Sequence, residues 1–519
     1  MEPRHAASDW LSPAQWLERH AARDPLRAAV VDVDRDQRIR YGELAAVVDS
    51  VALQLRERGV GHGSRVVLII DGGIETVVMW LALWRLAAVV CPFDISQIGA
   101  TATQVAFNTL KPALLLHGQR LGEADIPAGM GPHLRFGQWP PAPGELAAIR
   151  LEAAAHAPHQ RAALHRAGPR AQDLAAACCT SGSTGRMKIV LHDHASYALN
   201  GLASTHLLDL RQSDHLLDYR SFSWYSPQIL SLMPFLQLGF TLHLARQFSA
   251  SRFPEWIARH GITVAAGVPT VLNILLGHPL ERLRASSASL RVMSSSSAPL
   301  AASTWARFER ETGISIINLY GSSEGGWICG NRLVDRRIGS VGRPVPGMDV
   351  HILDTQGAPC ADGEPGEVVI EGAKLALGTL QPDGTLRPIR GQAFRTRDLA
   401  VREADGVVRL LGRMDDLVIR GGVKVSPGEI EDALLAHPGV AEAAAVGVPD
   451  AIYGQEVVAF VVAREDAVLD SPALQAHAAE QLPRAKRPLA VCIIDALPRN
   501  ARGKLRPDAL QALWREMVG

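Results

Sequence analysis

The 519-residue chain has no excess of either charge and no pattern of paired cysteines. Lysine plus arginine and aspartate plus glutamate each number 53, so the formal net charge is zero. Without a basic excess or an acidic tail, we expect no nucleic-acid partner. The six cysteines include no Cys-x-x-Cys pair, which argues against a disulfide framework and fits a reducing compartment. We therefore expect a cytoplasmic protein.

The chain also lacks an apolar leader and an apolar run of membrane length. Residues 1–12 are polar, so we expect no secretion signal. The most apolar long run, residues 76–90, contains Arg85 and is followed by Pro92. It is too short and too interrupted to cross a bilayer, which takes about 20 apolar residues. We interpret this run as a buried helix and expect no membrane span.

Strands and helices alternate along the first hundred residues. Apolar runs predict strands over residues 28–33, 65–70 and 89–93, and helical periodicity covers residues 41–58 and 75–86. Such alternation is typical of a parallel sheet with helices on both faces. Further on, short strands over residues 350–353 and 367–371, separated by turns, predict a smaller β subdomain.

Beyond residue 414 the pattern of elements restarts. Ser426-Pro427-Gly428-Glu429 has the form of a capping box that opens a helix. Strands over residues 441–448, 456–463 and 489–494 and helices over residues 471–482 and 507–517 follow. These elements predict a compact α+β unit of about a hundred residues. We place the domain boundary so that 1–414 and 415–519 are separate units.

One Gly- and hydroxyl-rich loop lies between two apolar runs and predicts strand, loop and strand. Thr180-Ser181-Gly182-Ser183-Thr184-Gly185 is followed by Lys188. Glycines bring backbone N–H groups close to an anion, so a polyphosphate is the natural ligand. Arg186 after Gly185 excludes a Walker A loop, and the Gly-x-Gly-x-x-Gly spacing is absent. An ordinary Gly/Ser hairpin turn is the alternative.

Polar clusters follow several other predicted strands. They are Ser294–Ser297 before Ala298-Pro299, Tyr320–Glu324, Arg395–Asp398, Gly412–Asp416 and, near the end, Pro498–Lys504. In open α/β sheets, ligands bind outside the carboxyl ends of the strands. There an aromatic ring can stack on a base, an acid can bind a metal, and a carboxylate can hold the two hydroxyls of a ribose. Taken one at a time, each cluster could equally be a surface turn.

Together with the Thr180–Lys188 loop, these clusters resemble, in order and spacing, the adenylate-forming superfamily. That superfamily contains the acyl-CoA synthetases, the adenylation domains of peptide synthetases and the luciferases, and this chain looks most like a carboxylate–CoA ligase. The resemblance implies an α/β fold: a large N-terminal domain of two α/β subdomains plus a small β subdomain, then a small mobile α+β C-terminal domain.

The resemblance also implies a two-step reaction that uses ATP, Mg²⁺ and CoA. A carboxylic acid attacks the α-phosphate of ATP to give an acyl-adenylate and pyrophosphate. The thiol of CoA then takes the acyl group and releases AMP. The resemblance thus implies a magnesium-dependent, AMP-binding ligase of fatty-acid or aromatic-acid metabolism.

The resemblance assigns nucleotide-binding roles to residues of this chain. The ATP phosphates would be bound by Thr180, Ser181, Gly182, Ser183, Thr184, Gly185 and Lys188. Adenine and ribose would be bound by Ser297, Ala298, Pro299, Asn318, Tyr320, Gly321, Asp398 and Arg413. The catalytic residues would be Lys504, Glu324 and Ser323, with Glu324 also binding the metal.

The small domain would rotate about Asp415 between the two steps, because a lysine that serves the first step must leave before a thiol can enter. Gly421, Gly422 and Lys424 would then line the CoA tunnel. Two positions depart from the family pattern. Arg397 replaces the usual glycine of Thr-Gly-Asp, and Lys424 stands where many relatives have arginine.

The acyl pocket has no motif of its own. Candidates for its lining are Ser223, Trp224, Tyr225, Val268, Ser295 and Trp327, and each could instead be plain core. Phe222 is followed by Ser223 rather than by the aspartate that binds an amino group in peptide-synthetase domains, which argues against an α-amino acid. An apolar, uncharged lining would fit a fatty, alicyclic or aromatic acid.

Three functions stay open from the sequence. The first is an acyl-CoA synthetase, and the second is a stand-alone adenylating enzyme that loads the phosphopantetheine of a carrier protein. The third, a non-catalytic nucleotide-binding homologue, is disfavoured because Lys504 and Glu324 are both present. A homodimer also stays open. The pair His192-x-His194 is interpreted as a hairpin exit and a helix start rather than as metal ligands.

Overall fold

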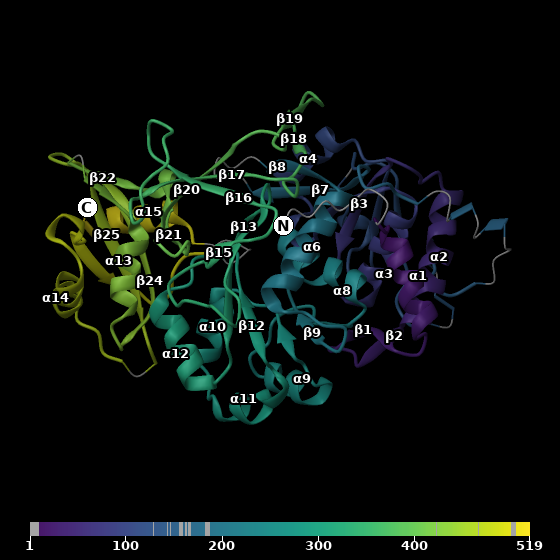
Figure 1. Ribbon diagram of the computed structural model, residues 1–519, viewed down its shortest axis with the longest axis horizontal. Helices are drawn as coiled ribbons and strands as arrows, with labels where there is room; N and C mark the ends of the chain where they lie inside the picture. Colours follow the sequence, from purple (N-terminus) through teal and green to yellow (C-terminus); the bar gives the residue numbers. More distant parts are fainter. Residues whose placement is uncertain are drawn as a thin grey trace.

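The computed structural model describes residues 10–127, 129–142, 144–145, 147–154, 159–160, 163–164, 168–181, 187–421, 423–465, 467–499 and 505–518. Four sheets organise this part of the chain. Three of them belong to the larger, N-terminal part, and the fourth lies in the C-terminal part at the other end of the molecule (Figure 1).

The first sheet has eight strands in the order β19-β18-β8-β7-β4-β3-β5-β6. The strands are β3 (Arg65–Ile70), β4 (Val89–Asp94), β5 (Leu114–His117), β6 (His133–Arg135), β7 (Leu174–Ser181), β8 (Met187–Asp193), β18 (Gly378–Leu380) and β19 (Leu386–Pro388). Strands β3 to β7 pair in parallel, whereas β8 returns antiparallel to β7. The two strands predicted on either side of the phosphate loop are confirmed, whereas residues 182–186 lie outside the described residues.

The second sheet has nine strands in the order β15-β14-β13-β12-β11-β9-β10-β1-β2. The strands are β1 (Ala28–Asp32), β2 (Gln37–Arg40), β9 (His215–Asp218), β10 (Thr241–Leu244), β11 (Val264–Ala265), β12 (Val292–Ser295), β13 (Ile316–Ser322), β14 (Gly326–Gly330) and β15 (Arg343–Pro344). Strand β1 is parallel to β10, about two hundred residues away in sequence. The N-terminal strand therefore joins the second sheet, not the sheet of β3 and β4.

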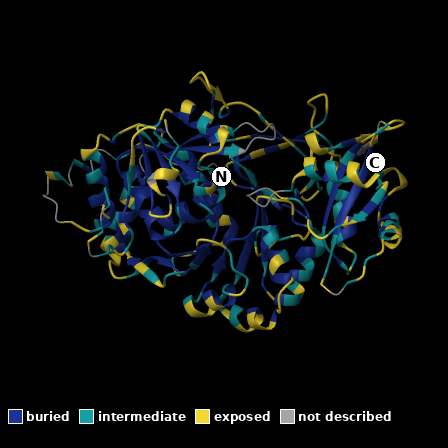
Figure 2. Ribbon diagram, turned by 180° about the vertical axis from the view of Figure 1, so that it is seen from behind, coloured by how far each residue is buried: buried dark blue, intermediate teal, exposed yellow. Residues whose placement is uncertain are grey.

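Helices form three layers around these two sheets. Between the sheets lie α2 (Tyr41–Glu57), α3 (Gly73–Arg85), α6 (His194–Leu208) and α8 (Met233–Leu238), whose apolar side chains share one core cluster with both sheets. Helices α9 (Phe253–His260), α10 (Pro269–Leu276), α11 (Glu281–Ser286) and α12 (Ala302–Thr312) cover the outer face of the second sheet. Helix α4 (Thr101–Leu110) covers that of the first. Buried residues follow the sheets and the inner helices, and exposed residues lie at the periphery (Figure 2).

Two helices of the N-terminal end are capped or buried as their sequences require, and the prediction of a buried helix, α3, is confirmed. Helix α1 (Pro13–Arg23) begins with Ser12 as its N-cap and a complete capping box with Gln15. Every residue of α3 is buried, and the Arg85 side chain is 3.1 Å from Asp49. Among the described residues, no helix is long and apolar enough to span a membrane.

A four-stranded antiparallel sheet forms the predicted β subdomain. Its strands are β16 (Asp349–Leu353), β17 (Gly366–Glu371), β20 (Phe394–Arg402) and β21 (Val408–Arg413). The 3₁₀ turn η5 (Met414–Asp416) follows β21 directly. The β subdomain thus lies immediately before the C-terminal part in the chain.

The C-terminal part contains one sheet and three helices. Strands β22 (Val418–Arg420), β23 (Val423–Val425), β24 (Val440–Asp450), β25 (Gly454–Ala463) and β26 (Ala490–Ile493) form the sheet. The helices are α13 (Pro427–Leu435), α14 (Ser471–Gln481) and α15 (Pro507–Val518). Two hydrophobic clusters within this part consist only of its own residues, so it packs around its own core.

The capping box predicted at Ser426 is wrong in its chemistry. Ser426 does occupy the N-cap of α13, but its side chain accepts no hydrogen bond from the helix. The hydroxyl donates instead to the backbone carbonyl of Leu411, on β21. A tertiary acceptor from the β subdomain therefore replaces the local cap.

Candidate active site

Two end residues of the predicted phosphate loop, Thr180 and Lys188, lie where the two large sheets approach each other. In the β7–β8 pair, Thr180 is directly opposite Lys188. Lys188 Nζ lies 3.9 Å from Glu324 Oε1, which is in the turn between β13 and β14 of the second sheet. Of the other predicted loop residues, the side chain of Ser181 and all of Gly182, Ser183, Thr184 and Gly185 lie outside the described residues.

The predicted ribose-binding residues meet in one hydrogen-bonded corner. The Tyr320 hydroxyl donates to Asp398 Oδ2 at 2.5 Å, although the two residues are on β13 and β20 of different sheets. Arg413 is directly opposite Asp398 in the β20–β21 pair, and its Nε lies 3.5 Å from Asp398 Oδ1. Burial raises the pKa of Asp398, and the nearby charge of Glu324 adds to this, while Tyr320 and Arg413 oppose it. The corner thus presents a preorganised carboxylate.

The end of β13 brings backbone and side chains close together. A Cβ on Gly321 would lie 2.3 Å from the carbonyl oxygen of Gly326, so only glycine fits there. Ser323 and Glu324 follow in the turn and are half-buried. The Asn318 amide, predicted to read adenine, donates one N–H to the Ser340 carbonyl at 2.9 Å. That bond uses one of the two N–H donors of the carboxamide and does not use its Oδ1, so the predicted role stays a prediction.

The second predicted adenine-binding segment follows the buried strand β12. Ser297, Ala298 and Pro299 are exposed, whereas the strand before them is fully buried. Ser297 has a φ of 72°, in the left-handed region that non-glycine residues adopt at a cost. Strained backbone of this kind clusters at binding sites, where the surrounding structure holds it in place.

Arg397 adopts the conformation that explains why glycine is usual at its position. Its φ is 64°, again left-handed. Its guanidinium group binds Asp415, with Nη2 2.5 Å from Oδ1 and Nε 3.1 Å from both carboxylate oxygens. Side-chain hydrogen bonding to Arg397 lowers the pKa of Asp415. The arginine thus binds the predicted hinge residue directly.

The predicted CoA tunnel is only partly described. Gly421 has a φ of 54°, and its N–H donates to the Tyr453 carbonyl at 3.0 Å. Gly422 and the side chain of Lys424 lie outside the described residues, and so does Lys504. The roles predicted for these three residues stay predictions.

Two of the six predicted acyl-pocket residues are joined through Asn200 of α6. Asn200 Nδ2 donates to the Tyr225 hydroxyl at 3.3 Å, and Asn200 Oδ1 accepts from the Trp327 backbone N–H at 3.0 Å. The Tyr225 ring stacks on His192 with ring centroids 4.0 Å apart. The Trp327 indole donates to Ser204 Oγ at 2.7 Å. Tyr225 and Trp327 therefore lie on one polar network.

The other four candidates are distributed around this pair. Trp224 directly precedes Tyr225, and the Ser223 hydroxyl is 2.9 Å from that of Ser221. Ser295 is fully buried, and its hydroxyl finds no hydrogen-bond partner within the described part of the chain. Val268 packs against the outer core cluster of the second sheet, whereas Tyr225 and Trp327 belong to the inner one.

The sequence prediction missed Lys374, which lies between β17 and β18. Its side chain is only 1% exposed, and its ammonium group donates to the Trp327 carbonyl. Burial lowers the pKa of Lys374 to about 7. The only indication in the sequence is that this lysine lies within the short apolar run 373–377, which is equally typical of a lysine at the surface.

His192 and His194 behave as structural residues. His192 is in β8 and His194 opens α6, as predicted. Burial lowers the pKa of each to about 3, so both imidazoles are neutral at physiological pH. Among the residues that the structure describes, no group of three or more His, Cys, Asp or Glu side chains could hold a metal ion.

The donor set still fits a magnesium ion that arrives with a nucleotide. Mg²⁺ is usually bound through one or two carboxylates plus substrate phosphates, not by an all-protein cage. Glu324 supplies one half-buried carboxylate beside the cationic Lys188. With the ribose corner, this arrangement suits a nucleotide at the carboxyl ends of the strands of an α/β protein.

Comparisons with known proteins agree with this class. The family model for the AMP-binding enzyme matches residues 17–380, and the model for the AMP-binding enzyme C-terminal domain matches residues 429–504. The chain belongs to the AMP-binding enzyme family. It is an AMP-forming acid–thiol ligase that uses ATP, Mg²⁺ and CoA.

Two relatives and one solved structure illustrate the similarity. Sulfoacetate–CoA ligase of Cupriavidus necator is 38% identical, over 63% of this chain and 64% of its own length. A CoA ligase of Mycobacterium tuberculosis, named for a methyl-dioxo-octahydroindenyl propanoyl group, is 31% identical over 96% of this chain and 98% of its own. The ATP-bound structure of MatB from Rhodopseudomonas palustris matches with a TM-score of 0.81 and 27% identity, covering 98% of this chain and 100% of that one. The predicted fold class and the predicted enzyme class are thereby confirmed.

Proposed function

We propose that this chain performs both half-reactions of an acid–CoA ligase at the junction of its two large sheets. The observation that carries the proposal is the convergence of five side chains from distant segments. Lys188 Nζ lies 3.9 Å from Glu324 Oε1. Close by, Tyr320 of β13 and Arg413 of β21 both contact Asp398 of β20. In this proposal Lys188 is the phosphate-binding cation, Glu324 the metal-binding acid and Asp398 the ribose-binding acid.

The first half-reaction brings an anionic carboxylate to an anionic triphosphate, so the protein contributes charge neutralisation and positioning. The Thr180–Lys188 loop holds the phosphates, Ser323 faces the α-phosphate, and Asp398 accepts hydrogen bonds from the ribose hydroxyls. Lys504 donates to the acid and to the α-phosphate oxygens as charge develops between them. Bound Mg²⁺, held by Glu324, neutralises phosphate charge.

Adenine lies between Tyr320 and the exposed segment Ser297–Pro299 in this proposal. Gly321 allows the nucleotide to approach the backbone, because no side chain fits there. The Ser340 carbonyl holds one N–H of Asn318 in place, and the remaining N–H and Oδ1 of the carboxamide read the edge of the base.

The second half-reaction requires Lys504 to leave and a thiol to enter. We place the domain boundary between residues 414 and 415 and the pivot at Asp415, in the short turn η5 that follows β21. Rotation there would carry Gly421, Gly422 and Lys424 toward the acyl-adenylate to line the path of CoA. The separate hydrophobic clusters of residues 418–514 support movement of this part as one body.

CoA, rather than a carrier protein, is the acceptor in this proposal, because the relatives above are named as CoA ligases. One chain supplies every residue that the proposal uses, so a homodimer is not required. The six cysteines are free thiols, which supports a reducing, cytoplasmic location.

The acid is not settled by the relatives, whose names differ in chemistry. Sulfoacetate carries a second anionic group, whereas the bicyclic propanoate carries ketones. The proposed acyl pocket of this chain contains Ser223, Trp224, Tyr225, Ser295 and Trp327, with Val268 at its outer side.

The test is pyrophosphate release from Mg-ATP across short to long fatty acids, benzoates, alicyclic acids, dicarboxylic acids and amino acids, with and without CoA. We expect release with one class of acid, together with AMP and a CoA thioester. Release without thioester formation would contradict CoA as the acceptor. ATP binding without release for any acid would contradict the catalytic proposal.

A further inference from the structure

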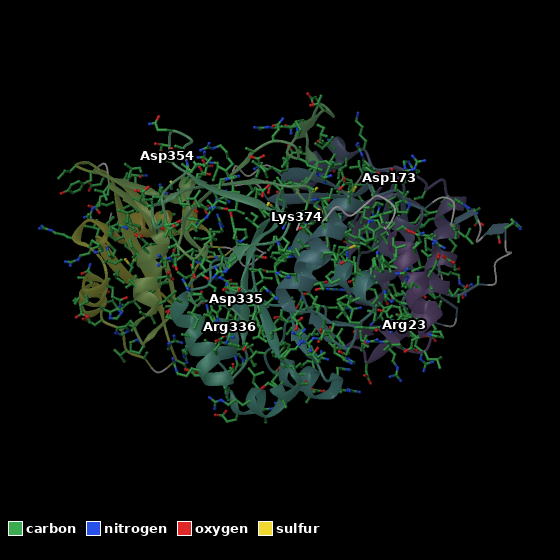
Figure 3. The ribbon with its side chains drawn as sticks, in the orientation of Figure 1. Arg23, Asp173, Asp335, Arg336, Asp354 and Lys374 are labelled. Atoms are coloured by element: carbon green, nitrogen blue, oxygen red, sulfur yellow. The ribbon has the colours of Figure 1, made fainter. Side chains whose placement is uncertain are left out.

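Lys374 is a buried lysine without an anionic partner among the described residues. Figure 3 labels it near the centre of the view, and Asn200 of α6 donates to its backbone carbonyl. The side chain is 1% exposed, and its ammonium group has one hydrogen-bond acceptor, the Trp327 carbonyl. No carboxylate of the described residues lies within ion-pair distance of it. By contrast, the buried Arg220 donates through Nε and Nη2 to the two carboxylate oxygens of Asp218.

The surroundings of Lys374 connect the acyl pocket to the metal-binding turn. Asn200 Nδ2, which contacts the Tyr225 hydroxyl, also donates to the Lys374 carbonyl at 3.0 Å. Two residues further on, the Ala376 N–H donates to the Glu324 carbonyl at 2.8 Å. Lys374 is thus held between two proposed pocket residues, Tyr225 and Trp327, and the turn that carries Glu324.

An unpaired buried ammonium destabilises a fold, because the lost hydration is not replaced. One carbonyl satisfies only one of the three N–H donors of a lysine. If the pocket served a plain fatty or aromatic acid, an apolar side chain of similar length would pack there without this cost. A ligand that brings its own negative charge would supply the missing partner and a charge-assisted hydrogen bond.

We propose that Lys374 binds a second anionic group, a carboxylate or a sulfonate, on the acid that this enzyme activates. The preferred substrate is therefore an acid with two anionic ends, one adenylated and the other held at Lys374 beside Asn200 and Tyr225. This inference rests on the proposed function, because it takes Tyr225 and Trp327 as walls of the acyl pocket.

The test compares acids in matched pairs that differ only in the second anionic group: succinate with butyrate, glutarate with valerate, 3-sulfopropanoate with butyrate, and phthalate with benzoate. For the wild-type enzyme we expect kcat/KM for pyrophosphate release to favour the dianionic member of at least one pair by about 10²-fold or more. Lys374→Met should reduce that preference to about tenfold or less, chiefly through KM for the acid.

Lys486→Met is the matched control. It makes the same chemical change at a lysine of the C-terminal part, where Lys486 pairs with Glu429. The preference between paired acids should stay as in the wild type. Equal preference in Lys374→Met and the wild type would overturn the inference, and so would a wild-type preference for the monoanionic member of every pair.

Failure of this inference can be separated from failure of the proposed function. If no acid releases pyrophosphate, the proposed function fails, and calorimetric binding of each acid pair in the presence of ATP then tests Lys374 directly. If Lys374→Met does not fold, the wild-type ratio across the pairs decides the question. Selection of a ketone-bearing acid over its dianionic analogue would also overturn the inference.

Discussion

The two ends of the proposed site are built in opposite ways. At the nucleotide end, the charged groups already have protein partners: Asp398 is bound by Tyr320 and Arg413, and Glu324 faces Lys188. At the acyl end, Lys374 has no anionic partner among the described residues, and the Ser295 hydroxyl has no acceptor there. The nucleotide end is thus preorganised for a ligand common to a whole class of enzymes, whereas the acyl end is completed by its own substrate.

The largest effect should come from the residue that acts only while charge develops. Lys504→Ala should lower the rate of adenylation by roughly 10²–10³-fold, the scale for losing one preorganised charge-stabilising donor. Thioester formation from preformed acyl-adenylate should fall far less, because Lys504 leaves the site before that step. Single-turnover measurements of each half-reaction check this, and equal losses in both would contradict the role given to Lys504.

The ribose corner should show a smaller loss, confined to the nucleotide. Asp398→Ala should raise KM for ATP by about 10²-fold, because hydrogen bonds to a charged acceptor contribute about 1.5–3 kcal/mol. Tyr320→Phe keeps the carboxylate and the ring and should change KM only a few-fold. Steady-state kinetics with ATP as the varied substrate compare the two variants. A larger effect from Tyr320→Phe than from Asp398→Ala would contradict the assignment of Asp398.

At the acyl end we expect a gain in stability, whereas the substitutions at the nucleotide end cause a loss of activity. Lys374→Met should raise the free energy of unfolding at pH 7 by about 1–4 kcal/mol, because it removes a buried unpaired charge. The folded-state pKa of Lys374, about 7, is below the ordinary value of 10.5. Between these values the unfolded chain binds more protons, so the wild type becomes more stable as the pH rises.

The advantage of Lys374→Met should therefore shrink as the pH rises from about 7 toward 10. In that window the folded lysine is already largely neutral, and the free-energy cost of removing the proton that the unfolded chain still carries falls. Calorimetric melting temperatures of both proteins at pH 7 and pH 9.5 measure this difference. A variant that is less stable than the wild type at pH 7, or a gap that widens with pH, would show that the lysine is paired in the folded protein.

The smallest effect is expected at Arg397. Arg397→Gly removes an exposed ion pair with Asp415 and a left-handed residue at the same time. Exposed ion pairs contribute little and relief of backbone strain opposes the loss, so the melting temperature should move by less than about 3 °C. The ratio of the two half-reaction rates should change less than about threefold. A large change in this ratio would instead show that Arg397 controls movement about Asp415.

Predictions from sequence succeeded where the structure depends on neighbouring residues. The β7–β8 strand pair and the buried helix α3 both follow from patterns within about twenty residues. At Ser426 the expected cap did not form: the hydroxyl accepts no hydrogen bond from the helix and is oriented toward the Leu411 carbonyl of another sheet, to which it donates. The placement of β1 beside β10 also has no local signal, since pairing between strands depends on how the whole chain packs.

The same distinction between local and long-range structure applies to the candidate site. Asp398, Tyr320 and Glu324 could be named from short motifs, although only the structure shows that they meet. Asn318 was assigned to the base, and only the structure shows that one N–H of its amide is held by the Ser340 carbonyl. Lys374 could not be found at all, because a lysine in a loop is normally solvated. Its burial results from α6 and β14, which are far from it in the sequence.

The class of chemistry could be predicted from short motifs, because the segments assigned to phosphates and ribose each consist of residues that follow one another closely. Such contiguous segments can be recognised in any chain that contains them. The groups that surround the acid at the acyl end could be identified only from the tertiary structure. That end is assembled from α6, β14 and the segment after β17, and its central feature, an unpaired buried ammonium, exists only once those elements pack and exclude water.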